Sequence, residues 1–224
     1  MATLIIVAPV NRSSVLLAAD GKRINAVDST DSIAGCKILR MENLVFTAAG
    51  HTEGPSFSVH KIAQEVGRLQ ISFEQQLSVF EELLLAVLPD AVHRLVAATG
   101  QPFPLSTIVT TIFSGHVPGH IVRADRRFVL DDDAVRVDAR RDFTDATLGP
   151  LSLFGSAAPD VTTFADNLMC RSQGPPDPVE YCRIVMEEAF RVRPDLVGPP
   201  ISIVEVTAHR SRWLPGFSDP SWSA

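Results

Sequence analysis

The sequence has only three cysteines, Cys36, Cys170 and Cys182, and no two of them form a CxxC pair. Their odd number and wide spacing do not suit a framework of disulfides. Cysteine outside disulfides is among the most buried residue types and packs as a small apolar side chain. We therefore expect three ordinary buried thiols.

The sequence also lacks any run of lysine and arginine, and its net charge is -6. A nucleic-acid backbone and an anionic membrane both require concentrated positive charge, so neither is expected as the main partner. No stretch approaches the roughly 20 apolar residues of a membrane span. TLIIVA, near the start, is too short for the apolar region of a signal peptide. These absences predict a soluble, cytoplasmic protein.

The motifs of several enzyme classes are missing. There is no GxGxxG, Walker P-loop, HExxH or GxSxG, so dinucleotide, nucleotide, zincin and serine-esterase functions lose their usual support. His116 and His120 lie in GHVPGH, where Gly and Pro predict a turn, and no third and fourth ligand can be placed. We expect surface histidines there, and no metal or cofactor.

The length and composition of the chain indicate one domain. Its 224 residues are 46% hydrophobic, which is enough for one sizeable core. No internal repeat or clear linker divides the sequence. Residues 1–224 are therefore expected to form a single domain, with residues 213–224 as a Pro-, Ser- and Trp-containing tail.

The first part of the chain predicts two β-hairpins. Each consists of two short apolar runs around a polar turn, a pattern that is typical of paired strands. The four predicted strands are TLIIVA (3–8), SVLLAAD (14–20), GCKILRM (35–41) and NLVFTAAG (43–50).

Two helices are predicted next. Apolar residues recur at helical spacing after Pro55, which suits a first helical turn. Ser72 and Gln75 form a capping-box pattern that begins a second helix, and Pro89 is expected to kink it.

The rest of the chain repeats this order. Pro159 and Pro178 suit the first turns of two further helices. Grouped strands, rather than strands alternating singly with helices, favour an antiparallel α+β sandwich over a doubly wound sheet. The remaining predicted strands are STIVTTIFSG (106–115), HIVRAD (120–125), AVRVDA (134–139) and PISIVEVTAHR (200–210).

Two charged residues lie in strands that should be buried. SVLLAAD ends in Asp20, and a carboxylate at a buried strand end must be paired or hydrogen-bonded to remain charged. Lys37 is the obvious partner, although alternation on a half-solvated sheet would point it to water instead. Burial would also make the lysine give up its proton more easily. The first strand adds a hydroxyl, Thr3, where a free chain end could act as a base.

The ordered set TLIIVA, SVLLAADG, GCKIL and NLVFTAAG resembles the first strands of proteasome β-type subunits and their simpler bacterial relatives. These are threonine peptidases with an N-terminal nucleophile (Ntn hydrolases). The resemblance implies a four-layer αββα sandwich of two antiparallel sheets flanked by helices. It also implies that Thr3 attacks the peptide carbonyl, that Asp20 and Lys37 tune it, and that the Gly50 N–H stabilises the oxyanion.

The resemblance continues more weakly downstream. Gly155 and Ser156, after LSLF, match the family's Gly-Ser ahead of the third helix, and Asp195 matches an aspartate that supports the nucleophile. Active relatives usually carry a serine where this sequence has Gly198. As partners, the family implies a peptide or unfolded-protein substrate, a homo-oligomeric ring and an ATP-dependent unfoldase.

Two hypotheses about function stay open. A threonine-type endopeptidase needs Thr3 as a free N-terminus, because an amine with an unperturbed pKa of about 8 accepts the hydroxyl proton. The chain begins Met1, Ala2, Thr3, and removal of Met1 alone leaves Ala2 at the end. The alternative is a catalytically inactive subunit of the same fold, which keeps Asp20 and Lys37 as a structural ion pair.

Two further residues near the predicted site have weaker functional interpretations. Cys36 is disfavoured as a nucleophile, because its side chain should point to the opposite face from Lys37. His51 could line the same cleft, but we expect an exposed turn histidine.

Overall fold

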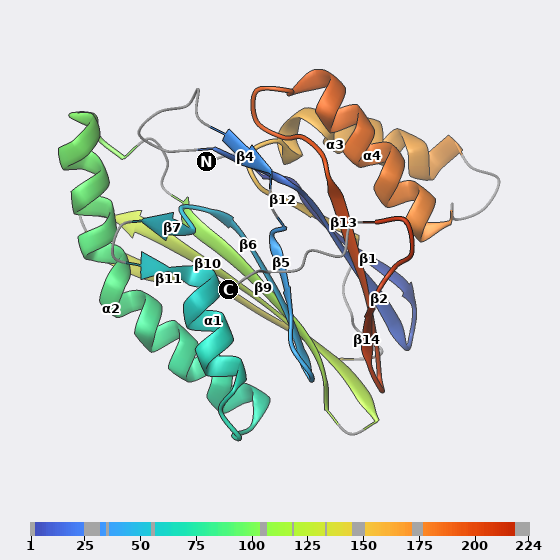
Figure 1. Cartoon of the computed structure of the whole chain (residues 1–224), viewed down its shortest axis with the longest axis horizontal. Helices are drawn as coiled ribbons and strands as arrows, with labels where there is room; N and C mark the ends of the chain where they lie inside the picture. Colours follow the sequence, from blue (N-terminus) through green and yellow to red (C-terminus); the bar gives the residue numbers. More distant parts are fainter. Residues whose placement is uncertain are drawn as a thin grey trace.

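The computed structural model describes residues 3–24, 32–34, 36–54, 57–103, 107–117, 119–132, 134–144, 151–171 and 177–217. Within these residues the chain forms two five-stranded antiparallel sheets and four helices (Figure 1). The antiparallel α+β organisation expected from the grouping of the strands is confirmed.

The first sheet has the strand order β12-β1-β2-β13-β14, and the second has the order β11-β10-β9-β6-β5. The strands of the first sheet are β12 (Ser152–Phe154), β1 (Ile5–Asn11), β2 (Ser14–Asp20), β13 (Ile201–Thr207) and β14 (Ser211–Trp213). Those of the second are β11 (Ala134–Thr144), β10 (His120–Asp131), β9 (Thr107–Val117), β6 (Leu44–Gly50) and β5 (Ile38–Arg40). Two small ribbons pair β3 (Lys22–Ile24) with β4 (Ser32–Ala34) and β7 (Glu53–Gly54) with β8 (Phe57–Ser58).

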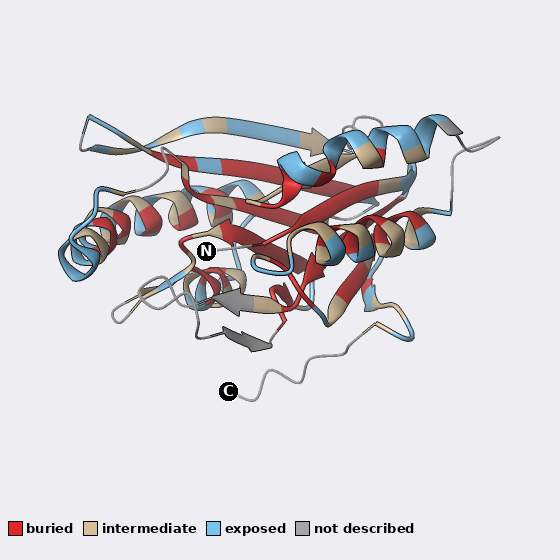
Figure 2. Cartoon of the chain, turned by 90° about the horizontal axis from the view of Figure 1, so that it is seen from above, coloured by how far each residue is buried: buried red, intermediate tan, exposed pale blue. Residues whose placement is uncertain are grey.

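Helices cover the outer face of each sheet, so the elements stack in four layers (Figure 1). One apolar cluster joins the second sheet to α1 (Val59–Gly67) and α2 (Phe73–Thr99). Another joins the first sheet to α3 (Ala158–Arg171) and α4 (Pro178–Val192). A third cluster fills the space between the two sheets. Buried residues accordingly run along both sheets and along the sheet-facing sides of the helices (Figure 2).

Strand β2 illustrates how the sequence produces this layering. All seven of its residues are buried, as expected for a continuous apolar run between two covered faces. Leu16 and Ala18 pack toward α3 and α4, whereas Leu17 and Ala19 pack into the space between the sheets. The alternation of strand side chains thus supplies two cores from one segment.

The helix starts follow from capping. The capping box of Ser72 and Gln75 is confirmed, and α2 continues without a break through Pro89. Helix α1 begins later than expected, at Val59, because the Ser58 side chain accepts a hydrogen bond from the Lys61 N–H. Pro55, where that start was expected, lies outside the described residues.

The described C-terminal residues pack against the first sheet. Trp213 ends β14, which pairs with β13, and Leu214 and Phe217 contact the cluster under α3 and α4. Residues 218–224 of the expected tail lie outside the described part of the chain.

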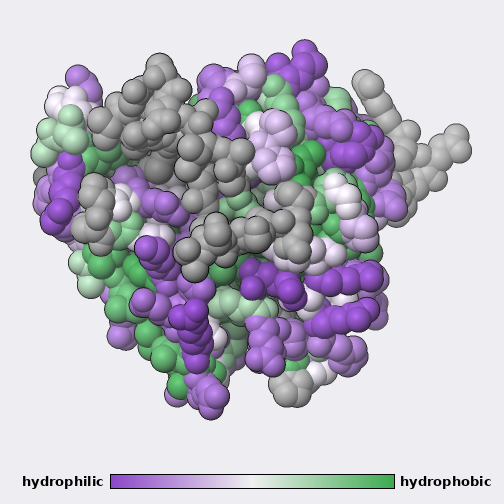
Figure 3. Space-filling model, in the orientation of Figure 1, coloured by the Kyte–Doolittle hydropathy of each residue, from purple (hydrophilic) through white to green (hydrophobic). Residues whose placement is uncertain are grey.

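None of the described helices is both long and apolar enough to cross a bilayer. Hydrophobic side chains gather over α1 and α2 on the face shown in Figure 3. Exposed large hydrophobic residues in or next to α2 include Leu69, Ile71 and Leu83.

Phe46 should contribute strongly to stability, because its ring lies 4.7 Å from that of Phe113 and 5.6 Å from that of Phe80 between sheet and helices. We expect Phe46→Ala to lower the free energy of unfolding by about 3–5 kcal/mol. Leu83→Ala, at a site that is 40% exposed, is the control and should change it by less than about 0.5 kcal/mol. Urea denaturation measures both, and equal effects would contradict the assigned packing.

Candidate active site

Asp20 lies at the end of β2, with β1 and β13 hydrogen-bonded on either side, and its side chain is fully buried. Its Oδ1 accepts a hydrogen bond from the Leu4 N–H at 2.8 Å, and its Oδ2 accepts one from the Lys22 N–H at 3.1 Å. Burial raises the pKa of Asp20, while Lys37 and these two N–H groups oppose that rise. The carboxylate is thus surrounded by hydrogen-bond donors although the layer around it is apolar.

Lys37 is the partner of Asp20, as predicted. Its Nζ lies 3.0 Å from Oδ1 and 2.9 Å from Oδ2 of Asp20, and the lysine is 5% exposed. The third neighbour of Nζ is Thr3 Oγ1, at 3.0 Å. An ammonium group has three donors, and these three acceptors match them.

The expectation that Lys37 lies inside a strand is wrong. Strand β5 begins one residue later, at Ile38, and pairs with β6. The Lys37 carbonyl instead accepts a hydrogen bond from Nε2 of His60 in α1, at 3.1 Å. This contact fixes the backbone from which the side chain reaches Asp20. His60 was not predicted from the sequence, where the only signal is a histidine among the apolar positions of a helix. Gly35, the first residue of the predicted strand 35–41, lies outside the described residues.

Thr3 lies just before β1, and it is buried. Its backbone N–H donates a hydrogen bond to Ser156 Oγ at 3.3 Å, while its hydroxyl contacts Lys37. The structure therefore brings together Thr3, Asp20, Lys37 and Ser156, which we call the Thr3 cluster. The four come from the starts or ends of separate segments.

Glycines permit the close approach of these segments. Gly155 has a φ of +105°, and a Cβ at this position would lie 2.1 Å from the Thr3 carbonyl oxygen. A side chain there would thus displace Thr3 from Ser156. Gly50 has a φ of +110°, and its Cβ would lie 2.3 Å from the Ile108 carbonyl oxygen.

Asp195 does not place its carboxylate in the Thr3 cluster. The carboxylate is exposed and binds Arg193, which holds the pKa of Asp195 below its usual range. Its link to the cluster is indirect: Lys22 Nζ donates to the carbonyls of Pro194 and Asp195, and the Lys22 N–H donates to Asp20.

Gly198, where the resemblance led us to expect a serine in an active enzyme, has room for a side chain. A Cβ there would make ordinary van der Waals contact with Lys22, at 3.5 Å. The Gly198 carbonyl accepts a hydrogen bond from the Gly21 N–H at 2.9 Å. The position is thus tied by its backbone to the loop that follows Asp20.

His51 was expected to be an exposed turn histidine, and this expectation is wrong. The ring is buried, and its centroid lies 5.0 Å from that of Phe57 and 6.4 Å from that of Phe103. Burial lowers the pKa of His51 to about 4. The imidazole is therefore neutral near pH 7.

The cysteines do not form disulfides. Cys36 is buried in the core between the sheets, and its thiol contacts the backbone of Ile38. Burial raises the pKa of Cys182 to about 12, so this thiol stays protonated. Cys170 is exposed, so the expectation of three buried thiols is wrong for this residue.

The described residues contain no group of His, Cys, Asp and Glu side chains that could hold a metal ion. His116 and His120 lie on β9 and β10, next to the turn that joins these strands, and His120 is exposed.

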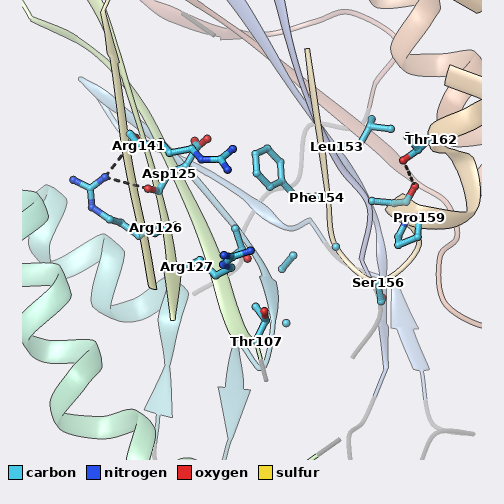
Figure 4. Close-up of a pocket in the computed structure, with 16 residues that line it drawn as sticks. Thr107, Asp125, Arg126, Arg127, Arg141, Leu153, Phe154, Ser156, Pro159 and Thr162 are labelled. Atoms are coloured by element: carbon cyan, nitrogen blue, oxygen red, sulfur yellow. Dashed lines mark hydrogen bonds between the residues drawn. The ribbon is translucent and has the colours of Figure 1, made fainter. Parts of the chain in front are cut away.

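A cavity of about 670 Å³ opens between the two sheets, at the edge formed by β11 and β12. One wall comes from β9, β10 and β11, and the other from β12 and the start of α3 (Figure 4). Gly50 and Ser156 both line this cavity. Because Ser156 also contacts Thr3, the cavity leads to the Thr3 cluster. Its basic residues, Arg127 and Arg141 among them, were not identified from the sequence.

Comparison with known proteins provides no family assignment. No protein-family model matches the chain, and no curated protein matches it. The assignment of the candidate site therefore rests on its geometry.

Loss of Lys37 should strongly destabilise the fold, because it leaves the Asp20 carboxylate buried without its charged partner. We expect Lys37→Met to lower the free energy of unfolding by about 3–5 kcal/mol. The double variant with Asp20→Asn should lose about 1–3 kcal/mol less than the sum of the single variants. As a control, Arg94→Met removes an exposed ion pair with Asp90 and should cost less than about 1 kcal/mol. Similar losses for Lys37→Met and Arg94→Met would contradict the buried pair.

His51 should make stability depend on pH. Between pH 6.5 and about 4, the unfolded chain binds a proton at His51 and the folded chain does not. The free energy of unfolding therefore falls as the pH falls through this window, by about 3 kcal/mol from this residue over the whole window. Denaturation of the wild type and of His51→Gln at several pH values measures the difference. Parallel pH profiles for the two proteins would show that His51 does not have the lowered pKa.

Proposed function

We propose that this chain is a proteasome-like, threonine-type peptidase subunit with the Ntn-hydrolase fold, and that Thr3 is its nucleophile. The observation that carries the proposal is the position of Lys37 Nζ, 3.0 Å from Thr3 Oγ1 and bound to both oxygens of Asp20. A threonine hydroxyl is a weak nucleophile until a base and a nearby positive charge activate it. The Thr3 cluster supplies the charge, and the amine of a free Thr3 supplies the base.

The chemistry would begin with transfer of the hydroxyl proton to the Thr3 amine. Lys37 lowers the pKa of this amine by charge repulsion and stabilises the developing negative charge on Oγ1. Asp20 keeps Lys37 charged and in place, while Ser156 Oγ holds the Thr3 nitrogen. As Oγ1 bonds to the peptide carbonyl carbon, the Gly50 N–H stabilises the oxyanion.

Collapse of this intermediate breaks the C–N bond, and the amine returns its proton to the departing nitrogen. Water then hydrolyses the ester on Thr3, with the amine again acting as base. The cavity between the sheets gives the substrate a path to the cluster, because Gly50 and Ser156 line it. We further propose a cytoplasmic, homo-oligomeric ring as the working form, with an ATP-dependent unfoldase as its partner.

A catalytically inactive subunit of the same fold is the second candidate. It is favoured by the Asp195 carboxylate, which binds Arg193, and by the absence of a hydroxyl at Gly198. In that case Asp20 and Lys37 would orient the starts of β1 and β5 without chemistry.

The two candidates differ in what a free Thr3 does. A cleavable fusion whose removal leaves Thr3 as the first residue provides the test protein, and intact mass verifies its N-terminus. We expect it to hydrolyse short fluorogenic peptides and to gain the mass of one peptide epoxyketone. Thr3→Ala should lower hydrolysis by about a thousandfold or more, because it removes the nucleophile.

Thr3→Ser, which keeps a hydroxyl at the same place, is the matched control and should retain part of the hydrolysis and form the epoxyketone adduct. If the protein with a free Thr3 neither cleaves any peptide nor forms the adduct, the peptidase proposal is lost. Comparison of the full chain's intact mass with that of its Thr3→Ala variant then shows whether the protein itself exposes Thr3.

A further inference from the structure

The cavity has a basic wall whose residues face the first sheet. The pairing of β6, β9, β10 and β11 places Ala49, Thr110, Arg127 and Ala139 side by side in one row across the second sheet. In the neighbouring row, Asp125 of β10 lies opposite Arg141 of β11. The first row begins at Ala49 of β6, beside Gly50, and ends at Ala139 of β11, the strand at the edge of the second sheet.

The charges on this wall do not cancel. Asp125 is neutralised by Arg123, whose Nε and Nη2 lie 2.8 and 2.6 Å from its two oxygens. Arg127 pairs with Asp138. The Arg141 side chain, in contrast, is exposed and makes no hydrogen bond or ion pair within the described part of the chain. One guanidinium therefore remains uncompensated at the cavity.

The side chains of Arg126 and Arg140 belong to the opposite face of the same strands, although Arg126 also borders the cavity. Both donate hydrogen bonds to Glu81 of α2, on the helix-covered side of the sheet. Their contacts confirm the alternation that turns Arg127 and Arg141 toward the cavity.

The wall opposite the arginines is largely apolar. Leu153, Phe154 and Pro159 line it and lie across the cavity from the residues of β10 and β11 (Figure 4). A charge beside an apolar wall is screened less than one on an open surface, so an anion placed here would be attracted more strongly. A guanidinium also matches the planar shape of a carboxylate.

The distance from the site suits a peptide. Strands β6 and β11 are three spacings apart, which is about 14 Å at roughly 4.8 Å per spacing. An extended chain covers about 3.3 Å per residue, and the arginine side chain reaches back toward the site. A peptide bound at the Thr3 cluster would therefore bring a group about two to four residues from the scissile bond to Arg141.

We propose that this cavity is a carboxylate-binding subsite in which Arg141 selects peptides with a negative charge about two to four residues from the scissile bond. The identity of the ligand as a peptide rests on the proposed peptidase function. The carboxylate can come from an Asp or Glu side chain or from the C-terminus of the peptide. The geometry is the same for both sources, and the peptides used in the test separate them.

Binding tests this inference independently of catalysis. The probes are fluorescein-labelled peptides that carry either Glu or Gln at each position on both sides of one cleavage sequence. Each peptide is made as a C-terminal acid and as a C-terminal amide. Fluorescence anisotropy measures the binding of each peptide to the protein. The protein has a free N-terminus at residue 3 and carries Thr3→Ala, so that the peptides stay intact. We expect Glu at one such position, or the C-terminal acid, to strengthen binding about three- to tenfold at low salt, and less at high salt.

The matched variants are Arg141→Gln and Arg140→Gln, which remove the same charge from neighbouring residues on opposite faces. Arg141→Gln should abolish the preference for the carboxylate, whereas Arg140→Gln should retain it. Arg141→Glu should reverse the preference, toward peptides with Lys at the same position. Because the Arg141 side chain has no partner among the described residues, its variants should unfold at the wild-type temperature.

The outcomes separate this inference from the proposed function. Equal binding of Glu and Gln peptides, and of acid and amide forms, overturns the subsite even if the protein with an intact Thr3 hydrolyses all of them. The subsite is equally wrong if Arg140→Gln removes the preference as fully as Arg141→Gln does. A preference that depends on Arg141, without hydrolysis by the protein with an intact Thr3, supports the subsite and rejects the peptidase.

Discussion

The buried pair of Asp20 and Lys37 is the interaction on which the site depends. A carboxylate without exposure is tolerated in this layer because one ammonium and two backbone N–H groups surround it. These donors come from the residue before β1, the first residue of β3 and the residue before β5. The contacts that neutralise the Asp20 carboxylate therefore hold three segments of the chain together. The same contacts position Thr3.

The second constraint is that both sheets are covered by helices outside and by each other inside. The centre of the space between them is filled by aliphatic side chains, such as Ile5, Leu17 and Ile112. Toward the edge at β11 and β12, polar and charged residues replace them, and the sheets enclose a cavity instead of a core. An opening of this kind at the end of an apolar layer gives access to the Thr3 cluster without exposing it on a flat surface.

Much of this arrangement could be predicted from local patterns. The apolar run of β2 has the bounds that its sequence indicated, and the need to neutralise Asp20 identified Lys37 from residue types alone. The features that were not predicted depend on contacts between distant segments. His51 is buried because Phe57 and Phe103 fold over it, and β12 becomes a strand because three residues pair with β1.

Arg141 shows the limit most clearly. Strand β11 carries charged residues on both of its faces. Its sequence therefore does not tell which arginine faces the helices and which faces the first sheet. Pairing with β10 decides this, because it sets Arg141 opposite Asp125. The position of the Asp195 carboxylate likewise depends on its ion pair with Arg193, which the sequence pattern did not predict.

The contact between His60 and the Lys37 carbonyl joins the outermost layer of the molecule to its centre. Helix α1 packs on the outer face of the second sheet, yet one of its side chains holds the backbone of the lysine in the Thr3 cluster. A displacement of α1 along its axis would consequently pull on the ammonium position. The position of α1 on the second sheet and the position of the Lys37 backbone are therefore linked through the His60 imidazole.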